Sequence, residues 1–296
     1  MATLGTLLTA MVTPFNQDLS VNYDRAGDLA RKLVAEKSEG LVIAGTTGES
    51  PTLTVDEKLS LFKCTREAVG TDATVVGGTG SNDTAASIEL TKAAAELGVL
   101  DGVMLVGPYY NKPSQEGLYE HFKACAQATD LPVIVYNVPG RTGKNIEADT
   151  VLRLAEDVPN IKAVKEASGD LVQVSRICAG MPDDFAVYSG SDEFTLPILS
   201  VGGLGVISVV SHLVGPDVAG MLDAFHAKDT QRAWRLHHKQ LDMYDACFLP
   251  SGNPACVKHG LELCGFEIGP SRLPVVPVSD KDADCIKAAC ESLGLC

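Results

Sequence analysis

The sequence predicts an α/β protein in which strands and helices alternate to form a (β/α)₈ TIM barrel, followed by a small helical domain. About eight short apolar runs alternate with amphipathic stretches, at fairly even spacing. The runs are apolar throughout, as in parallel strands that are buried on both faces. After Gly215-Pro216 the strand signals stop and only helical patterns follow. We therefore expect a barrel domain over residues 1–228 and a C-terminal helical domain over residues 229–296.

The expected strands alternate with helices in chain order, and helices alone fill the last part of the chain. We expect strands at Leu7–Val12, Gly40–Gly45, Thr74–Thr79, Gly102–Val106, Pro132–Asn137, Ile161–Glu166, Ala186–Ser189 and Gly205–Val209. We expect helices at Tyr23–Glu36, Val55–Val69, Thr84–Leu97, Gln115–Thr129, Ala148–Asp157, Leu171–Met181, Asp217–Ala227, Thr230–Tyr244, Pro254–Leu263 and Asp280–Leu293. A doubly wound sheet is the alternative, but no GxGxxG motif opens a helix after the first strand.

The composition excludes several classes of partner. The chain has 296 residues, a formal net charge of −14 at pH 7 and a pI near 4.8. A protein this acidic lacks the basic face that nucleic acid requires, and it is not attracted to anionic lipid. Its apolar runs are too short to cross a bilayer. We therefore expect neither nucleic acid nor a membrane as a partner.

The cysteines and the amino terminus favour a cytoplasmic protein. The nine cysteines are odd in number and form no CxxC pair, so we expect free thiols and no metal site. Residues Met1–Gly5 show no basic segment ahead of an apolar one, so no signal peptide is indicated. Several cysteines gather late in the chain, and the sequence suggests no function for them.

The strand expected at Ile161–Glu166 contains the first candidate for chemistry. Alternation places Ile161, Ala163 and Lys165 on one face, with Lys165 at the carboxyl end, where the active sites of such barrels lie. Loss of solvation there lowers the pKa of a lysine and leaves the neutral amine that Schiff-base chemistry needs. Lys162 falls at the structural, amino end. The plainer alternative is a strand-end lysine that packs its stem and keeps its ammonium in water.

Three other strand ends bring polar groups to the same rim. They are Gly45–Ser50 (GTTGES), Pro108–Asn111 (PYYN) and Tyr136–Arg141 (YNVPGR). Hydroxyl groups can shuttle the protons of Schiff-base formation, and a guanidinium suits a carboxylate. Each group also has a structural interpretation, because threonines cap turns, tyrosines pack and arginines lie on surfaces. Their convergence on one rim favours an active site.

Together these motifs resemble the dihydrodipicolinate (4-hydroxy-tetrahydrodipicolinate) synthase family, which belongs to the pyruvate-dependent, class I aldolase-like lyases. The resemblance runs from Leu8–Phe15 (LTAMVTPF) to Arg272–Pro274 (RLP). Its most specific pieces are Gly45–Ser50 (GTTGES), Pro108–Tyr119 (PYYNKPSQEGLY), Tyr136–Gly143 (YNVPGRTG), Lys165–Ala167 (KEA) and Gly205–Val209 (GVISV).

The resemblance implies a role for each catalytic residue. Lys165 would form a Schiff base with pyruvate, and Tyr136 would donate and accept protons. Thr47 would link Tyr136 to Tyr110, which reaches in from the neighbouring subunit, and Thr46 would belong to the same relay. The reaction would be the condensation of pyruvate with L-aspartate 4-semialdehyde, the first committed step of diaminopimelate and lysine biosynthesis.

The resemblance also implies the substrate contacts and the assembly. Thr47 would contact the pyruvate carboxylate, the backbone at Ile207 would complete the pyruvate pocket, and Arg141 would hold a carboxylate of the semialdehyde. No metal or organic cofactor would be needed, because the lysine supplies the electrophilic nitrogen. Members are commonly homotetramers built from two tight dimers.

Two alternatives stay open beside this interpretation. An N-acetylneuraminate lyase or another 2-keto acid aldolase would share Lys165 and Tyr136, although the GTTGES motif, the tyrosine pair and Arg141 look more like the synthase. A non-catalytic, ligand-binding relative would have little reason to keep an amine and a proton relay together.

The effector site of the family is only partly matched. Many synthases are inhibited by lysine, and four positions of that site look present: Ser50, Pro51, Asn82 and Tyr109. Val55 and Lys58 stand where sensitive members have histidines, and Ala86 stands where a glutamate would hold the effector's ammonium. Because Lys58 adds repulsion and Ala86 removes an attraction, we expect weak or absent inhibition by lysine.

Overall fold

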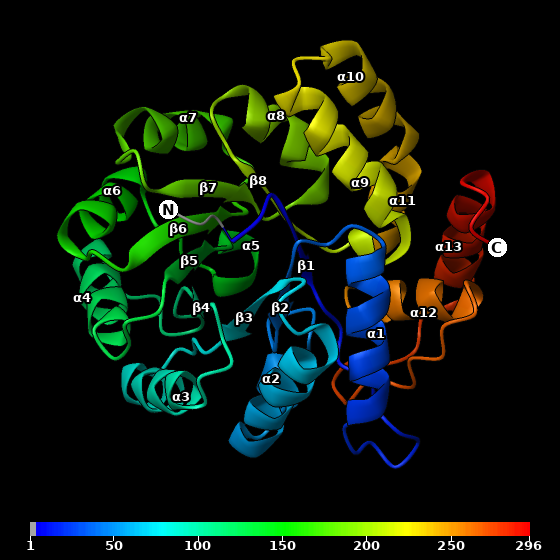
Figure 1. Cartoon of the computed structure of the whole chain (residues 1–296), viewed down its shortest axis with the longest axis horizontal. Coiled ribbons are helices and arrows are strands. Elements are labelled where there is room, and N and C mark those ends of the chain that lie inside the picture. Colours follow the sequence, from blue (N-terminus) through cyan, green and yellow to red (C-terminus); the bar gives the residue numbers. More distant parts are fainter. Residues whose placement is uncertain (1–3) are drawn as a thin grey trace.

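Eight parallel strands close into a barrel in the structure, a computed structural model that describes residues 4–296. Residues 1–3, part of the segment on which the signal-peptide prediction depends, lie outside the described residues. The strands pair in chain order, and the barrel is closed because β1 (Leu7–Ala10) pairs with both β2 (Gly40–Ile43) and β8 (Gly205–Ser208) (Figure 1). The predicted (β/α)₈ barrel is confirmed.

All eight expected strands are present, and they differ from the prediction only at their ends. The other strands are β3 (Thr74–Gly78), β4 (Gly102–Val106), β5 (Val133–Asn137), β6 (Ile161–Glu166) and β7 (Ala186–Ser189). β1, β2, β3 and β8 end one or two residues earlier than expected. At these carboxyl ends the backbone leaves the strand for the loops of the rim.

Helices surround the barrel, and polar side chains set where several of them begin. The ring consists of α1 (Tyr23–Ala35), α2 (Val55–Val69), α3 (Thr84–Glu96), α4 (Gln115–Ala126), α6 (Ala148–Asp157), α7 (Leu171–Gly180), α8 (Thr195–Ser200) and α9 (Ser211–His226). At the start of α2, the Thr54 hydroxyl accepts from the Glu57 N–H, while the Glu57 carboxylate accepts from the Thr54 N–H. The sequence prediction missed α8 and the single turns η1 (Ser50–Thr52), α5 (Pro139–Thr142) and η2 (Asp192–Phe194), which are too short for a helical period.

Most expected helices differ from the structure by one to three residues at an end, and two predictions were wrong by more than that. α9 begins at Ser211, not at Asp217, and it is two pieces joined at Val214, which has non-helical backbone angles. Pro216 is tolerated because it lies in the first turn of the second piece, where its missing N–H has no helical partner. The helix expected over 230–244 is also two helices, α10 (Thr230–Lys239) and α11 (Leu241–Cys247), divided at Gln240.

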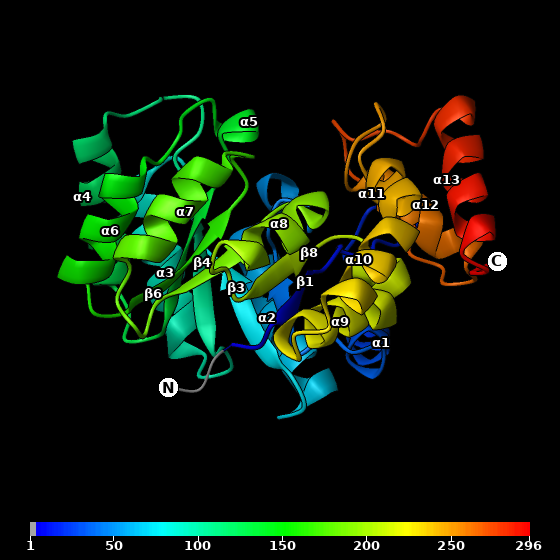
Figure 2. The ribbon, with the colours of Figure 1, turned by 90° about the horizontal axis from the view of Figure 1, so that it is seen from above.

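The last helices form a group on one side of the barrel. α12 (Ala255–Leu263) and α13 (Asp280–Ser292) lie beside α11, away from the strands (Figure 2). Within residues 4–296, no helix combines the length and the apolar character that a membrane crossing demands.

The barrel has an inner and an outer core, and a bulge in β6 decides which residues face inward. Ile134 and Tyr136 belong to the inner core, whereas their neighbours on β5 belong to the core between strands and helices. Ile161 pairs with Val133 but Ala163 pairs with Ile134, so one extra residue interrupts β6. The prediction that Ile161 shares a face with Ala163 was therefore wrong, because Ile161 packs in the outer core.

Candidate active site

Lys165 is buried at the carboxyl end of β6, beside Tyr136 of β5. The two residues pair across the strands, and the Lys165 Nζ lies 4.4 Å from the centroid of the Tyr136 ring. Lys165 is only 4% exposed. Burial lowers its pKa to about 8; the charge of Asp192 opposes this shift, and the charge of Arg141 adds to it. An appreciable fraction of the amine is therefore neutral near physiological pH.

Burial shifts the pKa of Tyr136 in the opposite direction to that of Lys165. Burial raises the pKa of its phenol to about 12, although the charge of Arg141 and the hydroxyl of Thr46 act against this shift. The phenol consequently keeps its proton at neutral pH and can donate it. A neutral amine next to a protonated phenol is the combination that carbinolamine formation and dehydration require.

The GTTGES loop after β2 brings Thr46 and Thr47 to this pair. Thr46 and Thr47 both line a cavity of about 300 Å³ that also contains Lys165, Tyr136 and Arg141. Thr47 is buried. The structure thus places all five of these residues around one cavity at the carboxyl ends of the strands.

Residues from the last part of the chain, between α11 and α13, hold this loop in place, and the sequence analysis did not identify them. The Asn253 Nδ2 donates to the Thr47 Oγ1 at 2.9 Å. Glu49, which has a φ of +57°, forms a buried ion pair with Lys258. The Lys258 Nζ lies 2.6 Å from the Glu49 Oε1. The backbone N–H of Arg272 donates to the other Glu49 oxygen at 2.9 Å. These partners lie more than 200 residues from the loop in sequence, so no local pattern links them.

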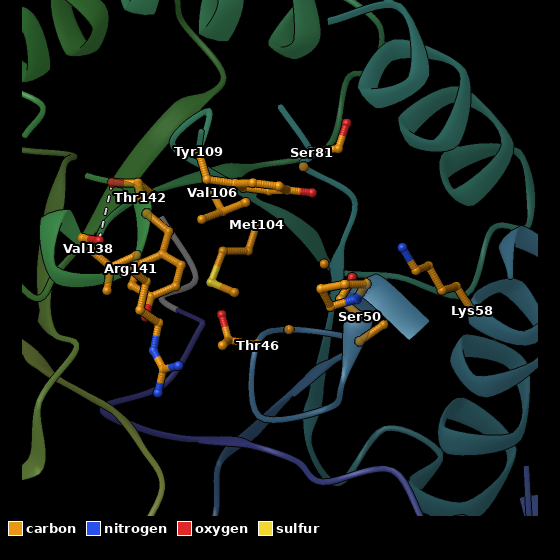
Figure 3. Close-up of a pocket in the computed structure, with 16 residues that line it drawn as sticks. Thr46, Ser50, Lys58, Ser81, Met104, Val106, Tyr109, Val138, Arg141 and Thr142 are labelled. Carbon is orange, nitrogen blue, oxygen red and sulfur yellow. Dashed lines mark hydrogen bonds between the residues drawn. The ribbon is translucent and has the colours of Figure 1, made fainter. Parts of the chain in front are cut away.

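Arg141 lies at the mouth of the cavity on α5, with an exposed side chain. Thr46 and Met104 line the same cavity as Arg141, and all three are labelled in Figure 3. A second cavity of about 260 Å³ shares Thr46, Tyr136 and Arg141 with the first and extends toward Ser50. A cation at the mouth of a buried site suits a substrate that carries a carboxylate.

Gly190, Ser191 and Val209, at the ends of β7 and β8, line the first cavity, whereas Ile207 and Asp192 are not among its lining residues. Ile207 is buried in the inner core of the barrel. Asp192, which the sequence prediction missed, is 3% exposed, and its Oδ2 accepts from the N–H groups of Val209 and Val210 at 2.9 and 3.2 Å. The carboxylate thereby ties the turn after β7 to the end of β8.

Tyr110 does not join the other predicted residues within one chain. It is 89% exposed, lines neither cavity and has a φ of +74°, which is a strained conformation for a residue other than glycine. The predicted relay from Tyr136 through Thr47 to Tyr110 is therefore incomplete in a single chain.

The residues of the possible effector site lie around the second cavity. Ser50, Pro51 and Tyr109 line it, and the Asn82 Nδ2 donates to the Tyr109 carbonyl at 3.1 Å. Lys58 extends from α2 toward the cavity (Figure 3), and burial lowers the pKa of its amine.

The two remaining positions of that site offer a ligand little attraction. Val55 is 52% exposed, and Ala86 lies exposed in the first turn of α3. Neither side chain carries a group that can hold an ammonium.

Among the described residues, neither the cysteines nor the other possible metal ligands form a metal site. All nine cysteines are free thiols, as expected. Across residues 4–296, no three His, Cys, Asp or Glu side chains are grouped so that they could hold a metal ion.

The model of the Dihydrodipicolinate synthetase family matches residues 3–293. The chain belongs to this family. A 4-hydroxy-tetrahydrodipicolinate synthase of Moorella thermoacetica is 55% identical over 98% of this chain and 99% of its own length. A relative of the same name from Symbiobacterium thermophilum is 51% identical over the full length of both chains.

Solved structures of dihydrodipicolinate synthases have the same fold. The enzyme of Cyanidioschyzon merolae with lysine bound superposes with a TM-score of 0.97 at 45% identity, covering 99% of both chains. A Bacillus anthracis dihydrodipicolinate synthase superposes with a TM-score of 0.95 at 44% identity and the same coverage. The predicted dihydrodipicolinate synthase family is confirmed, and the alternative of an N-acetylneuraminate lyase is not favoured.

Proposed function

We propose that this chain is a 4-hydroxy-tetrahydrodipicolinate synthase, a Schiff-base lyase. It condenses pyruvate with L-aspartate 4-semialdehyde, the first committed step of diaminopimelate and lysine biosynthesis. The relatives of this name at 51–55% identity support the reaction. The observation that supports the mechanism is the buried amine of Lys165, whose pKa is about 8, beside the protonated phenol of Tyr136.

The first half of the reaction forms an iminium on Lys165. The neutral amine attacks C2 of pyruvate, and Tyr136 supplies a proton to the carbonyl oxygen, which leaves as water. The positive nitrogen then accepts electrons from the adjacent methyl group as that group loses a proton. The product is an enamine, which attacks the aldehyde carbon of the second substrate. Transimination and ring closure release the heterocycle and restore the Lys165 amine.

The other residues of the cavity bind and orient the two substrates. Thr47, held by Asn253, contacts the pyruvate carboxylate, and the backbone at Ile207 closes that end of the pocket. Thr46 lies beside the Tyr136 phenol and belongs to the proton relay. Arg141 at the mouth holds the carboxylate of the semialdehyde, which its exposed guanidinium can meet before the aldehyde reaches the enamine.

Tyr110 completes the relay from a second copy of the chain. Its exposure and its left-handed backbone support this role, since strain in a surface tyrosine is stabilised where a partner surrounds it. The enzyme is therefore at least a dimer, and we propose a homotetramer built from two tight dimers. We also propose that it works in the cytoplasm and that residues 229–296 form a separate helical domain.

Mixing two inactive variants tests the shared site. Tyr110→Phe lacks the phenol that it lends to its neighbour, whereas Lys165→Ala lacks its own nucleophile. A mixed dimer of the two contains one intact site, so activity returns when the variants are unfolded and refolded together. If the co-refolded mixture stays as inactive as each variant alone, Tyr110 does not act across subunits.

The choice of second substrate is tested by turnover and by the Arg141→Ala variant. We expect condensation with L-aspartate 4-semialdehyde, and no cleavage of N-acetylneuraminate. Arg141→Ala raises the KM for the semialdehyde about tenfold or more, since it loses one charge-assisted contact, while pyruvate still forms its adduct. Turnover of N-acetylneuraminate in place of the semialdehyde would reject the synthase assignment.

A further inference from the structure

The carboxylate of Asp192 has one oxygen that the fold uses and one that it leaves free. Oδ2 accepts the two N–H groups at the end of β8. Oδ1 is buried and has no hydrogen-bond partner among the described residues. A buried carboxylate with an unpartnered oxygen is costly, so such a group calls for a reason. Gly190, two residues before Asp192, packs against the Lys165 side chain, and the negative charge of Asp192 is opposite in sign to that of the Lys165 ammonium.

The neighbouring acid, Glu166, shows by contrast what a purely structural carboxylate looks like here. It follows Lys165 on β6 and is fully buried, but its oxygens accept from Asn137 Nδ2 at 3.1 Å, Gln173 Nε2 at 3.0 Å and the Ser168 N–H at 2.8 Å. Glu166 therefore has its charge satisfied on the outer side of the strand. By contrast, the Oδ1 of Asp192 has no such partner among the described residues.

The proposed reaction creates a positive charge where there was none. The lone pair of the Lys165 amine forms a bond to C2 of pyruvate, the carbonyl oxygen leaves as water, and one proton is taken up overall. A neutral amine thus becomes a buried iminium cation. Arg141 already acts on this place with the same sign, so a fixed negative charge nearby lowers the energy of the iminium.

On the basis of the function proposed above, we propose that Asp192 is a positioning residue for the Schiff base. Its Oδ1 supplies the counter-charge of the iminium on Lys165, and its Oδ2 holds the end of β8 against the pyruvate pocket. The residue acts through Lys165 and the backbone beyond Ile207, without contacting the reacting carbon.

The titratable groups named here around Asp192, apart from Lys165, are a phenol, a thiol and a carboxyl, so they do not neutralise its negative charge. α11 packs against η2, and burial together with the Asp192 charge raises the pKa values of Tyr244 and Cys247 on α11, so both stay neutral. Glu193, next to it on η2, has a raised pKa mainly because of burial. Burial raises the pKa of Asp192 itself, while the hydroxyl of Ser208, the N–H groups at the end of β8 and the charge of Lys165 favour its ionised form.

Asp192→Asn tests the proposal, with Glu193→Gln as the matched control. Asparagine keeps the shape and can still accept the two N–H groups of β8, but it removes the charge. We expect kcat/KM for pyruvate to fall about tenfold, less than for loss of a donor that touches the reacting atoms. The acid limb of its pH profile should move to lower pH, because the charge that raised the Lys165 pKa is gone. Glu193→Gln removes the adjacent carboxylate and should leave that limb in place.

A measurement on the unmodified enzyme covers the case in which the variant does not fold. The ¹³C shift of enzyme-bound [2-¹³C]pyruvate should report a protonated iminium across pH 6–10. Loss of its proton near neutral pH would exclude a counter-charge, as would an unmoved acid limb in Asp192→Asn or an equal shift in Glu193→Gln. The absence of any pyruvate adduct on the unmodified enzyme would instead overturn the proposed function itself.

Discussion

Burial of Lys165 leads to a quantitative prediction about its reactivity. An ordinary lysine, with a pKa of 10.5, has roughly three neutral amines in ten thousand at pH 7. With the pKa of about 8 found here, about one amine in eleven is neutral. The folded barrel therefore raises the population of the nucleophile about 300-fold at pH 7, before any effect of orientation. This gain vanishes above the ordinary pKa, where both lysines are neutral.

The assay is a pulse of borohydride in the presence of saturating pyruvate, repeated from pH 6 to pH 11, with peptide mapping of the reduced adduct. We expect the adduct on Lys165, with an initial rate that is half-maximal near pH 8. Lys162 is the internal control, because it lies on the same strand but is partly exposed and paired with Asp184 at 2.5 Å. A half-maximal rate near pH 10.5, or equal labelling of Lys162, would refute the argument from desolvation.

Three further predictions concern stability and regulation. Lys165→Met should raise the free energy of unfolding at pH 7 by up to about 3 kcal/mol, because it removes an amine whose protonation is disfavoured in the folded state. The folded pKa is the lower one, so wild-type stability rises as the pH increases from about 8 to 10.5, and urea unfolding should show the two proteins converging by pH 11. Lys258→Met leaves the Glu49 charge buried without its partner and should cost about 3–5 kcal/mol in the same assay, part of it recovered by adding Glu49→Gln. Submillimolar lysine should not inhibit the enzyme, whereas a variant with both Lys58→His and Ala86→Glu should gain inhibition; strong inhibition of the unmodified enzyme would contradict the reading of these two positions.

The repeat of apolar runs was sufficient to predict the barrel, and its failures were local. Every strand was found because buried parallel strands are apolar on both faces, a property of the sequence itself. The bulge at Lys162 was not predictable, since an extra residue in a strand changes the facing of its neighbours without changing the composition. The sequence analysis also missed the short turns α5 and η2, which contain Arg141 and Asp192, because turns this short show no helical period.

The sequence by itself determined which residues stand at the carboxyl ends of the strands, and with them the family. Lys165, Tyr136 and the two threonines follow from the order of strands and loops, because all parallel strands of a barrel end at one rim. Only the tertiary structure decided how these groups behave. The pKa of Lys165 depends on desolvation inside the closed barrel and on the charge of Asp192, and the position of Thr47 depends on Asn253, 206 residues away. Burial and long-range contact are properties of the packed chain, so a linear pattern of residues cannot express them.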